Sequence, residues 1–217
     1  MNKTRTLIIA LLLSPLSNVT VQARAINWYS GIGDNFLTAD GVTLMDSTFS
    51  FELGGFGSGF TPDQTNFSLW QTNWVVFDSA TTANGGWNPT PGISNYGDQA
   101  STISAGGLLV NSSDTGNTFT IGQQAYIWTF NSKSLNSGSE WSLISSPSWT
   151  FPAADSLSLP LDWQISDPGI AAVAGATSFD GGTFVSTLQT QAVPEPGSAL
   201  LIAVAGVLIR LRRRVGR

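Results

Sequence analysis

Carboxylates are the side chains best suited to chemistry in this sequence, because it contains neither histidine nor cysteine. The lack of histidine excludes Ser-His and Cys-His nucleophilic catalysis and the usual zinc, copper and non-haem iron ligand sets. Retaining and inverting glycosidases need only two acids at set separations, and distant strands can supply them. Glu52 and Glu140 are the only glutamates ahead of the C-terminal tail, and Asp155, Asp162 and Asp167 lie close together in sequence. A carboxylate-based glycoside hydrolase is therefore one hypothesis for this chain.

Motifs for a nucleophile do not accompany these acids. Ser58 in Gly-Phe-Gly-Ser-Gly has Phe56 and Phe60 at the two positions where a nucleophile elbow needs glycine. Lys133 has no serine three residues before it, so a Ser-Lys dyad also lacks its motif. The sequence thus favours a non-enzymatic protein, and we assign no catalytic residue.

Calcium is the remaining candidate for a bound metal ion, because hard cations need only oxygen donors. The sequence contains no Asp-x-Asp-x-Asp loop, and its acids stand singly beside Gly, Asn, Ser or Pro, as in Asp34-Asn35 and Asp180-Gly181. Turn chemistry explains that placement without a metal. We therefore expect no cofactor and name no metal ligands, with weak Ca²⁺ binding as the open alternative.

The C-terminal tail, residues 193–217, has three segments in order. Pro194-Glu195-Pro196 comes first, an uncharged run at 197–209 follows, and a basic cluster ends the tail. The cluster contains Arg210, Arg212, Arg213, Arg214 and Arg217. A helix over the uncharged run would be about 20 Å long, against roughly 30 Å for the hydrocarbon core of a bilayer, so it is a marginal span. The arginines form a membrane stop and would hold their end on the cytoplasmic side.

This order of motif, apolar helix and arginine cluster resembles the PEP-CTERM sorting signal of Gram-negative bacteria, with Pro194-Glu195-Pro196 as the motif. The resemblance implies that an exosortase, a membrane protease-transpeptidase, removes the tail at or beside the motif. It also implies an association with exopolysaccharide, because carriers of the signal tend to occur with its production. A permanent tail anchor is the alternative, since a short span with a tight arginine stop can also stay in the membrane.

A secretory signal peptide is predicted at residues 1–25. Two basic residues precede an apolar run at 7–13, and the segment closes at Ala23-Arg24-Ala25, the small-x-small pattern of a cleavage site. We expect signal peptidase to cut after Ala25, with Ala23 as the second choice. The protein would then be exported, held transiently in the inner membrane by its C-terminal helix, and delivered to the cell surface or extracellular matrix.

The body between these segments, residues 26–192, has one basic residue, Lys133, against thirteen acids. Its charge of about −12 argues against binding nucleic acid or anionic lipid and favours cations or neutral polymers as partners. Without cysteine no disulfide can form, so stability must come from a packed core. The body is long enough for one such core, and eight tryptophans supply large apolar side chains, so we expect one domain.

Many short strands are expected in the body, because Gly or Pro interrupts every apolar stretch within about a dozen residues. Alternation or compact apolar runs place strands at 49–53, 74–77, 125–130, 141–144 and 156–163. Asp180-Gly181-Gly182 predicts a hairpin turn before a last strand at 183–188. The expected fold is mainly β: an antiparallel β-sandwich-like single domain with one short helix, between an N-terminal signal helix and a C-terminal membrane helix.

The short helix is expected after residues 61–64, Thr-Pro-Asp-Gln, which offer a capping hydroxyl, a proline at the first helical position and a glutamine able to reach back. Phe67, Trp70 and Trp74 then recur at three and four residues, as on one face of a helix of about ten residues. An aromatic stripe of this spacing usually packs on a sheet. The alternative is a sugar-stacking platform on a carbohydrate-binding module, which would show as exposed coplanar rings.

Residues 51–74 resemble a recurrent body type of PEP-CTERM proteins through Gly-Phe-x-x-Gly-Phe-Thr-Pro and the spaced tryptophans. Residues 122–152 resemble it through Gln-Gln-Ala-Tyr-Ile-Trp at 123–128, Glu140-Trp141 and Trp-Thr-Phe-Pro at 149–152. That resemblance implies a whole domain without adding an activity. We therefore expect an exported envelope or matrix protein whose body is of structural or interaction type, with a carbohydrate-binding module or a glycoside hydrolase as alternatives.

Overall fold

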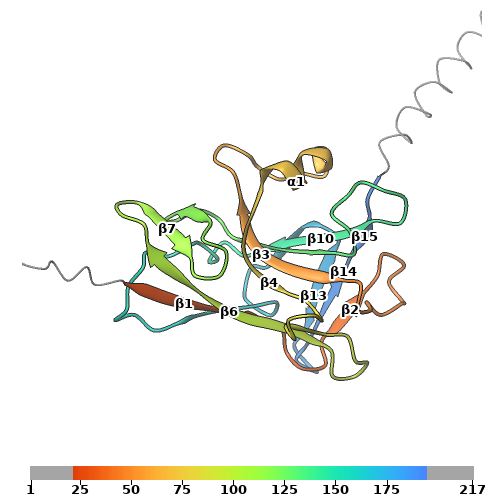
Figure 1. Ribbon diagram of the computed structural model, residues 1–217. Helices are drawn as coiled ribbons and strands as arrows, with labels where there is room; N and C mark the ends of the chain where they lie inside the picture. Colours follow the sequence, from red (N-terminus) through yellow and green to blue (C-terminus); the bar gives the residue numbers. More distant parts are fainter. Residues whose placement is uncertain (1–21, 195–217) are drawn as a thin grey trace, which may run out of the picture.

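The computed structural model describes residues 22–194 and shows a mainly β protein. Strands make up 45% of the structure and helices 4%, which confirms the expected fold class at this level. The first and last described residues lie at opposite ends of the body (Figure 1). Most of the predicted signal peptide, Glu195, Pro196 and the arginine cluster lie outside the described residues.

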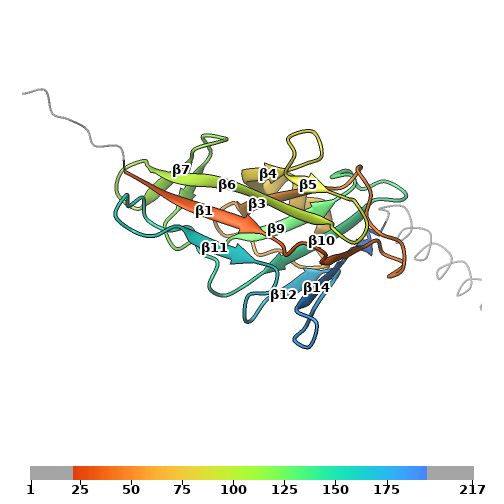
Figure 2. The same ribbon diagram turned by 90° about the horizontal axis from the view of Figure 1, so that it is seen from below.

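The first sheet is built from six strands. They are β1 (Ala23–Tyr29), β5 (Trp87–Asn88), β6 (Asn95–Ser104), β7 (Leu109–Ser112), β8 (Thr118–Thr120) and β11 (Leu161–Gln164). Their order is β11-β1-β6-β7-β8, with β5 added beside β6. Figure 2 shows β11, β1 and β6 running side by side across this layer.

The second sheet also has six strands, all paired antiparallel. They are β3 (Ser50–Phe56), β4 (Trp74–Ala80), β9 (Tyr126–Phe130), β10 (Glu140–Ser145), β12 (Ala171–Ala174) and β15 (Gln191–Ala192). Their order is β12-β10-β9-β3-β4, with β15 paired to β10. In Figure 1 this sheet lies above β1 and β6.

A third, smaller sheet contains β2 (Asn35–Leu37), β13 (Ala176–Asp180) and β14 (Val185–Gln189), in the order β13-β14-β2. The predicted hairpin is confirmed: β13 and β14 pair antiparallel, and Asp180 accepts hydrogen bonds from the Gly182 backbone N–H (2.9 Å) and the Thr183 hydroxyl (2.8 Å). These bonds extend the turn, so the last strand begins at Val185 instead of residue 183.

Two strand pairings are parallel, although the sequence predicted an antiparallel fold. β1 runs parallel to β11, and β14 runs parallel to β2. Side chains alternate between the two faces of a strand in either direction, so periodicity alone does not reveal the direction of pairing. The partners are also far apart in sequence, and only the folded chain brings them together.

The first core cluster fills the space between the two large sheets. Its members include Ile26, Trp28, Tyr96, Ala100, Val110 and Phe119 from the first sheet, and Phe51, Leu53, Phe77, Ile127 and Ile144 from the second. Phe51 and Tyr96 stack across the interface, with ring centroids 4.5 Å apart and planes 18° apart. Burial of these large rings supplies the packing that a disulfide-free domain needs.

The second core cluster lies on the opposite face of the second sheet. It contains Phe56, Phe67, Trp70, Trp74, Trp128, Phe130, Trp141, Leu143, Ala174 and Val193. Two short helical turns cover it, η1 (Phe67–Leu69) and α1 (Trp70–Asn73), and Figure 1 shows α1 outside this sheet. Trp70 stacks on Trp141 at 5.7 Å and 19°, so the aromatic stripe packs on the sheet as expected.

The predicted ten-residue helix is wrong in its length and start. The helical turns begin at Phe67, because Asn66 holds the preceding residues in a turn. Its side-chain carbonyl accepts from the Asp63 backbone N–H at 2.9 Å and from the Trp70 indole N–H at 2.7 Å. At the other end Trp74 is already extended and opens β4.

The strands expected near 49–53, 74–77, 125–130 and 141–144 are confirmed as β3, β4, β9 and β10. The strand expected at 156–163 is only partly right, since β11 begins at Leu161.

A turn precedes β11 because the Asp155 carboxylate accepts from the Leu157 backbone N–H (2.9 Å) and the Ser158 hydroxyl (2.5 Å). The longest strand, β6, escapes the sequence pattern because it is mostly polar and buries only Tyr96, Ala100 and Thr102.

Candidate functional site

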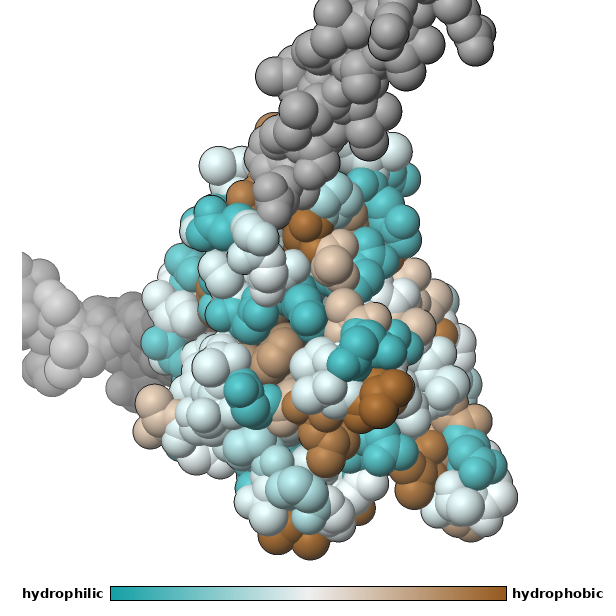
Figure 3. Space-filling model, turned by 90° about the vertical axis from the view of Figure 1, so that its right-hand side faces the viewer, coloured by the Kyte–Doolittle hydropathy of each residue, from teal (hydrophilic) through white to brown (hydrophobic). Residues whose placement is uncertain are grey.

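The C-terminal exit is the point where the body meets the predicted sorting motif. β15 pairs with β10, placing Gln191 opposite Trp141, and the Val193 backbone N–H donates to the Ser139 carbonyl at 2.9 Å. The Val193 side chain is buried in the second core cluster, whereas Pro194 is exposed. Val193, which the sequence pattern placed in the tail, therefore packs with the body. Figure 3, which views the molecule from the right-hand side of Figure 1, shows polar residues on that side interspersed with small apolar patches.

The predicted membrane features of the tail cannot be placed on this structure. Glu195, Pro196 and the membrane stop formed by Arg210 and the arginines after it lie outside the described residues, as does the uncharged run. Within residues 22–194, none of the helices has the length and apolar character that crossing a membrane requires.

The predicted signal cleavage site lies in β1. Ala23, Arg24 and Ala25 pair with Ile103, Thr102 and Ser101 of β6. The Arg24 guanidinium also donates to the Leu159 carbonyl at 3.1 Å. Cleavage after Ala25 would remove three residues from β1, whereas cleavage after Ala23 would remove one.

All eight tryptophans are buried, and their exposed fraction does not exceed 9%. They are Trp28, Trp70, Trp74, Trp87, Trp128, Trp141, Trp149 and Trp163. The hypothesis that Trp70 and Trp74 form a sugar-stacking platform is therefore wrong, because their rings pack against Trp128 and Phe56 instead of facing solvent.

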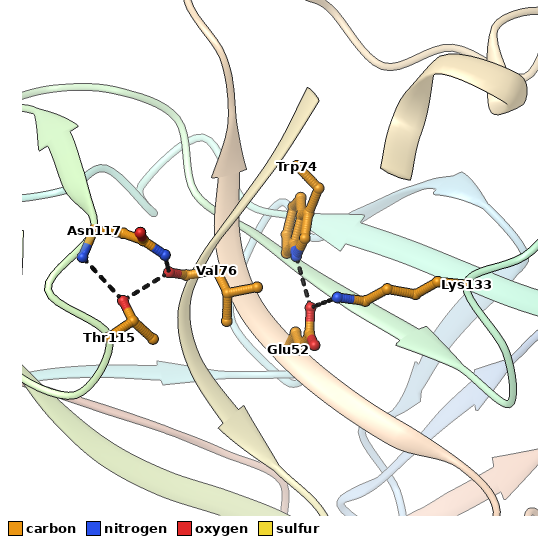
Figure 4. A network of polar contacts seen from close by, with 6 residues as sticks. All are labelled: Glu52, Trp74, Val76, Thr115, Asn117 and Lys133. Carbon is orange, nitrogen blue, oxygen red and sulfur yellow. Dashed lines mark hydrogen bonds and ion pairs between the residues drawn. The ribbon is translucent and has the colours of Figure 1, made fainter. Parts of the chain in front are cut away.

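Glu52 belongs to a charged pair on the outer face of the second sheet (Figure 4). One of its carboxylate oxygens accepts from the Trp74 indole N–H at 2.8 Å and lies 2.6 Å from the Lys133 ammonium. The same ammonium lies 5.6 Å from the Trp128 ring centroid and 5.0 Å from that of Phe130. The only basic side chain of residues 26–192 thus covers the second core cluster and neutralises the acid that reaches it.

Glu140 faces the other side of the same sheet. Glu52 lies opposite Trp128 across the β3–β9 pair, and Trp141, the neighbour of Glu140, packs in the same cluster as Trp128. Because side chains alternate along a strand, Glu140 points away from that cluster. Its carboxylate accepts from the Ala39 backbone N–H at 2.8 Å and the Thr190 hydroxyl at 2.7 Å. The two glutamates therefore do not share a cleft.

The three late aspartates also have separate partners. Asp155 holds the turn before β11, and Asp162 accepts from the Asn27 side-chain amide at 2.7 Å. Asp167 accepts from the Trp149 indole N–H at 2.7 Å and from the Gln164 backbone N–H at 3.1 Å. Each of the three carboxylates therefore stabilises a turn or strand contact of its own.

Acids beside turn residues bind the backbone of their own turns. Asp40 accepts from the Val42 and Thr43 backbone N–H groups, both at 2.8 Å, and from the Thr43 hydroxyl at 2.6 Å. These bonds, those from Thr43 above all, hold the pKa of Asp40 well below its usual range. Among residues 22–194, no three acidic side chains are grouped in a way that could hold a metal ion.

Asp78 is a buried carboxylate that no sequence pattern singles out. It lies on β4 and is 4% exposed, and it accepts from the Trp28 indole N–H at 2.6 Å and the Ser79 backbone N–H at 2.7 Å. Burial raises its pKa to about 7, with smaller contributions from the charges of Asp98 and Asp114, and the two hydrogen bonds oppose the shift. This acid therefore titrates near neutral pH.

The free edge of β4 is covered by side chains from the end of β7 and from the turn between β7 and β8. The Val76 carbonyl accepts from the Thr115 hydroxyl at 3.0 Å and the Asn117 amide at 2.8 Å (Figure 4). The Phe77 carbonyl accepts from the Ser112 hydroxyl at 2.5 Å. Pairing of this edge with another strand is therefore hindered, which protects the protein from edge-to-edge association.

A groove of about 530 Å³ lies where the connection after β3 meets β8 and the start of β9. Its aromatic side chains are Phe56, Phe60 and Tyr126, and the remaining lining is backbone, Val75, hydroxyl groups and amides. The lining contains no charged residue. The Gly-Phe-Gly-Ser-Gly-Phe stretch, which failed as a nucleophile motif, supplies one wall of this groove.

Gln123 joins the two sides of the groove. Its amide N–H donates to the Phe56 carbonyl at 3.0 Å, and its carbonyl accepts from the Thr120 backbone N–H at 3.0 Å. A Cβ on Gly55 would lie 2.6 Å from the Gln123 amide nitrogen, so glycine is needed there for this bridge to form. The groove floor is thus fixed by hydrogen bonds between segments far apart in sequence.

Comparison of the chain with protein-family models, with curated proteins and with solved structures finds no match.

Proposed function

We propose that this chain is an exported protein of the bacterial envelope or exopolysaccharide matrix, sorted by a PEP-CTERM tail. Signal peptidase and an exosortase are its processing partners, and the tail occupies the inner membrane only transiently. The body is a single β-sandwich-like domain, mainly antiparallel with two parallel strand pairings. It is of structural or interaction type, not an enzyme, and it does not bind nucleic acid.

The observation that carries the proposal is the junction at Val193. Val193 is buried and its backbone N–H donates to the Ser139 carbonyl, whereas Pro194, the first residue of the motif, is exposed. The motif, apolar run and arginine cluster then follow in sequence. A cut at or beside Pro194-Glu195-Pro196 would therefore remove the tail and leave the second core cluster complete.

The acidic body supports the same proposal. Its charge of about −12 keeps the domain soluble and self-repelling and argues against anionic polymers as partners. The glycoside hydrolase alternative gains no support, because Glu52 and Glu140 face opposite sides of one sheet and the late aspartates have separate partners. A binding function is the second candidate, because the uncharged groove is a preformed site on the surface.

Replacing Pro194-Glu195-Pro196 by three alanines tests the sorting signal. We expect the variant to be exported, because the signal peptide is unchanged, and to stay uncleaved in the membrane fraction, because the apolar run and arginine stop remain. Alanine also lets a helix extend back by three residues, or about 4.5 Å, which lengthens a marginal span. Fractionation and intact-mass analysis, in the native host or one carrying an exosortase, give the result.

The chain offers a matched control in Pro89-Thr90-Pro91, a second Pro-x-Pro triplet, which lies in the loop between β5 and β6. Its replacement by alanines should leave processing as in the wild type. A permanent anchor predicts a different pattern, in which the wild type and both variants stay in the membrane at full mass. Equal release of wild type and motif variant would refute the sorting signal.

A further inference from the structure

The uncharged groove between the connection after β3 and the strands β8 and β9 has the chemistry of a ligand site. Its volume of about 530 Å³ falls within the range of about 300 to 1,000 Å³ usual for ligand pockets. We propose that this groove binds a segment of a neutral polysaccharide, with Phe60 and Tyr126 contacting sugar rings and the surrounding amides and hydroxyls contacting sugar hydroxyl groups.

The aromatic side chains form a continuous apolar surface in the groove. Phe56 lies between the other two rings, with centroids 5.1 Å from Phe60 and 5.5 Å from Tyr126. Phe56 is buried, whereas Phe60 and Tyr126 are partly exposed, so the outer two rings are the ones a ligand can reach. Such a surface suits contact with the apolar C–H face of a sugar ring. The eight tryptophans cannot make this contact, because they are buried.

Polar groups able to pair with sugar hydroxyls surround these rings. Thr118 and Thr120 project to solvent from β8 while Phe119 between them is buried. Tyr126 is half-buried and lines the groove. Burial also raises the pKa of its hydroxyl, so it stays protonated and can donate at neutral pH. A hydroxyl beside an apolar surface is suited to fixing the orientation of a ligand.

The lack of charge decides which polymers fit. A uronic-acid polymer would need a basic partner, and the one lysine of residues 26–192 is already paired with Glu52 on another part of the second sheet. The acidic body would also repel a polyanion. A cationic ligand would be expected to meet a carboxylate, yet the lining has none. Neutral sugars require only stacking and hydrogen bonds, and the groove provides both.

This inference deepens the proposed interaction role of the body and is independent of tail processing. We would measure it by affinity electrophoresis of the full chain in detergent, through native gels containing dextran, hydroxyethylcellulose or galactomannan, with alginate as the anionic comparison. Retardation is expected in at least one neutral polysaccharide and not in alginate. An uncleaved tail does not affect this measurement, so its failure and the failure of the sorting proposal are distinguishable.

Three variants locate the site. Phe60→Ala should weaken binding by about tenfold or more, because it removes a stacking ring. Tyr126→Phe keeps the ring and should cost about two- to tenfold, the range for one hydrogen bond. Thr120→Arg places a bulky charged side chain at an exposed position of the lining and should block binding without touching the core, so it serves if Phe60→Ala fails to fold.

Phe184→Ala is the matched control, because Phe184 is 79% exposed on the β13–β14 hairpin and does not line the groove. It should bind like the wild type. The proposal would be overturned if all four variants were retarded as strongly as the wild type. It would also be overturned if no neutral polysaccharide changed the mobility of the wild type, or if alginate retarded it more strongly.

Discussion

Replacing Asp78 with asparagine should stabilise the protein at neutral and alkaline pH. The carboxylate is buried between the two large sheets, where it accepts from Trp28 and Ser79. In the unfolded chain its pKa is near 3.8, and in the folded protein burial raises it to about 7. The folded state therefore holds this proton more tightly than the unfolded state. The contribution of Asp78 to stability is fully present below about pH 4 and is lost as the pH rises through about 7.

The size of the effect follows from the shift. A difference of about 3 pKa units corresponds to about 4 kcal/mol at most, at about 1.4 kcal/mol per unit. Asparagine can still accept from the Trp28 indole, but its amide N–H₂ would face the Ser79 backbone N–H, and an unsatisfied group costs about 1 to 3 kcal/mol. We therefore expect Asp78→Asn to gain about 1 to 3 kcal/mol at pH 8 and to gain nothing at pH 5.

Urea unfolding followed by tryptophan fluorescence, at intervals from pH 5 to 8, measures this difference. The wild type should lose stability across that range, and the variant should lack the part of this loss that Asp78 causes. Asp162→Asn, at an exposed position on β11, is the control and should behave as the wild type. An unchanged pH dependence in Asp78→Asn, or a variant that is less stable at pH 8, would refute the reasoning.

Two further predictions concern the core and the N-terminus. Trp70→Ala should lower the free energy of unfolding by about 3 to 5 kcal/mol, because Trp70 is fully buried. Leu69→Ala, on the exposed side of the same turn, is the control and should lower it by under about 1 kcal/mol. Equal losses for the two variants in urea unfolding would contradict the packing of Trp70. The small-x-small pattern predicts Ile26 as the first residue of the exported protein, whereas the contacts of Arg24 favour cleavage after Ala23 and a start at Arg24. Intact mass separates the two, and an exported protein that retains Met1 would refute a cleaved signal.

Strands with a clear pattern could be predicted from the sequence. In β3, β9 and β10 the apolar residues lie close together in the chain, so local periodicity identifies the strands. β6 could not be found, because it is ten residues long yet mostly polar, and its few buried side chains matter only once β1 pairs beside it. The prediction of where the helix starts failed for a related reason. The hydrogen bonds of the Asn66 side chain outweighed the capping pattern at residues 61–64.

The candidate sites divide in the same way. The sorting motif is a linear pattern, so Pro194-Glu195-Pro196 and the segments after it can be recognised without a fold, and they remain predictions. The groove and the buried environment of Asp78 are not formed by consecutive residues. The groove joins the connection after β3 to β8 and β9, and Asp78 meets Trp28 across 50 residues of sequence, so no local spacing could reveal either.

By itself, the sequence determined the mainly β class, the acidic body and the exclusion of histidine and cysteine chemistry, because composition and local alternation are enough to establish them. Only the tertiary structure decided that all eight tryptophans are buried, that Glu52 and Glu140 lie on opposite faces, and that the uncharged groove exists. The physical reason is that burial and convergence depend on which strands pair and which faces meet. Those contacts join residues far apart in the chain, and their energies are not encoded in any single segment.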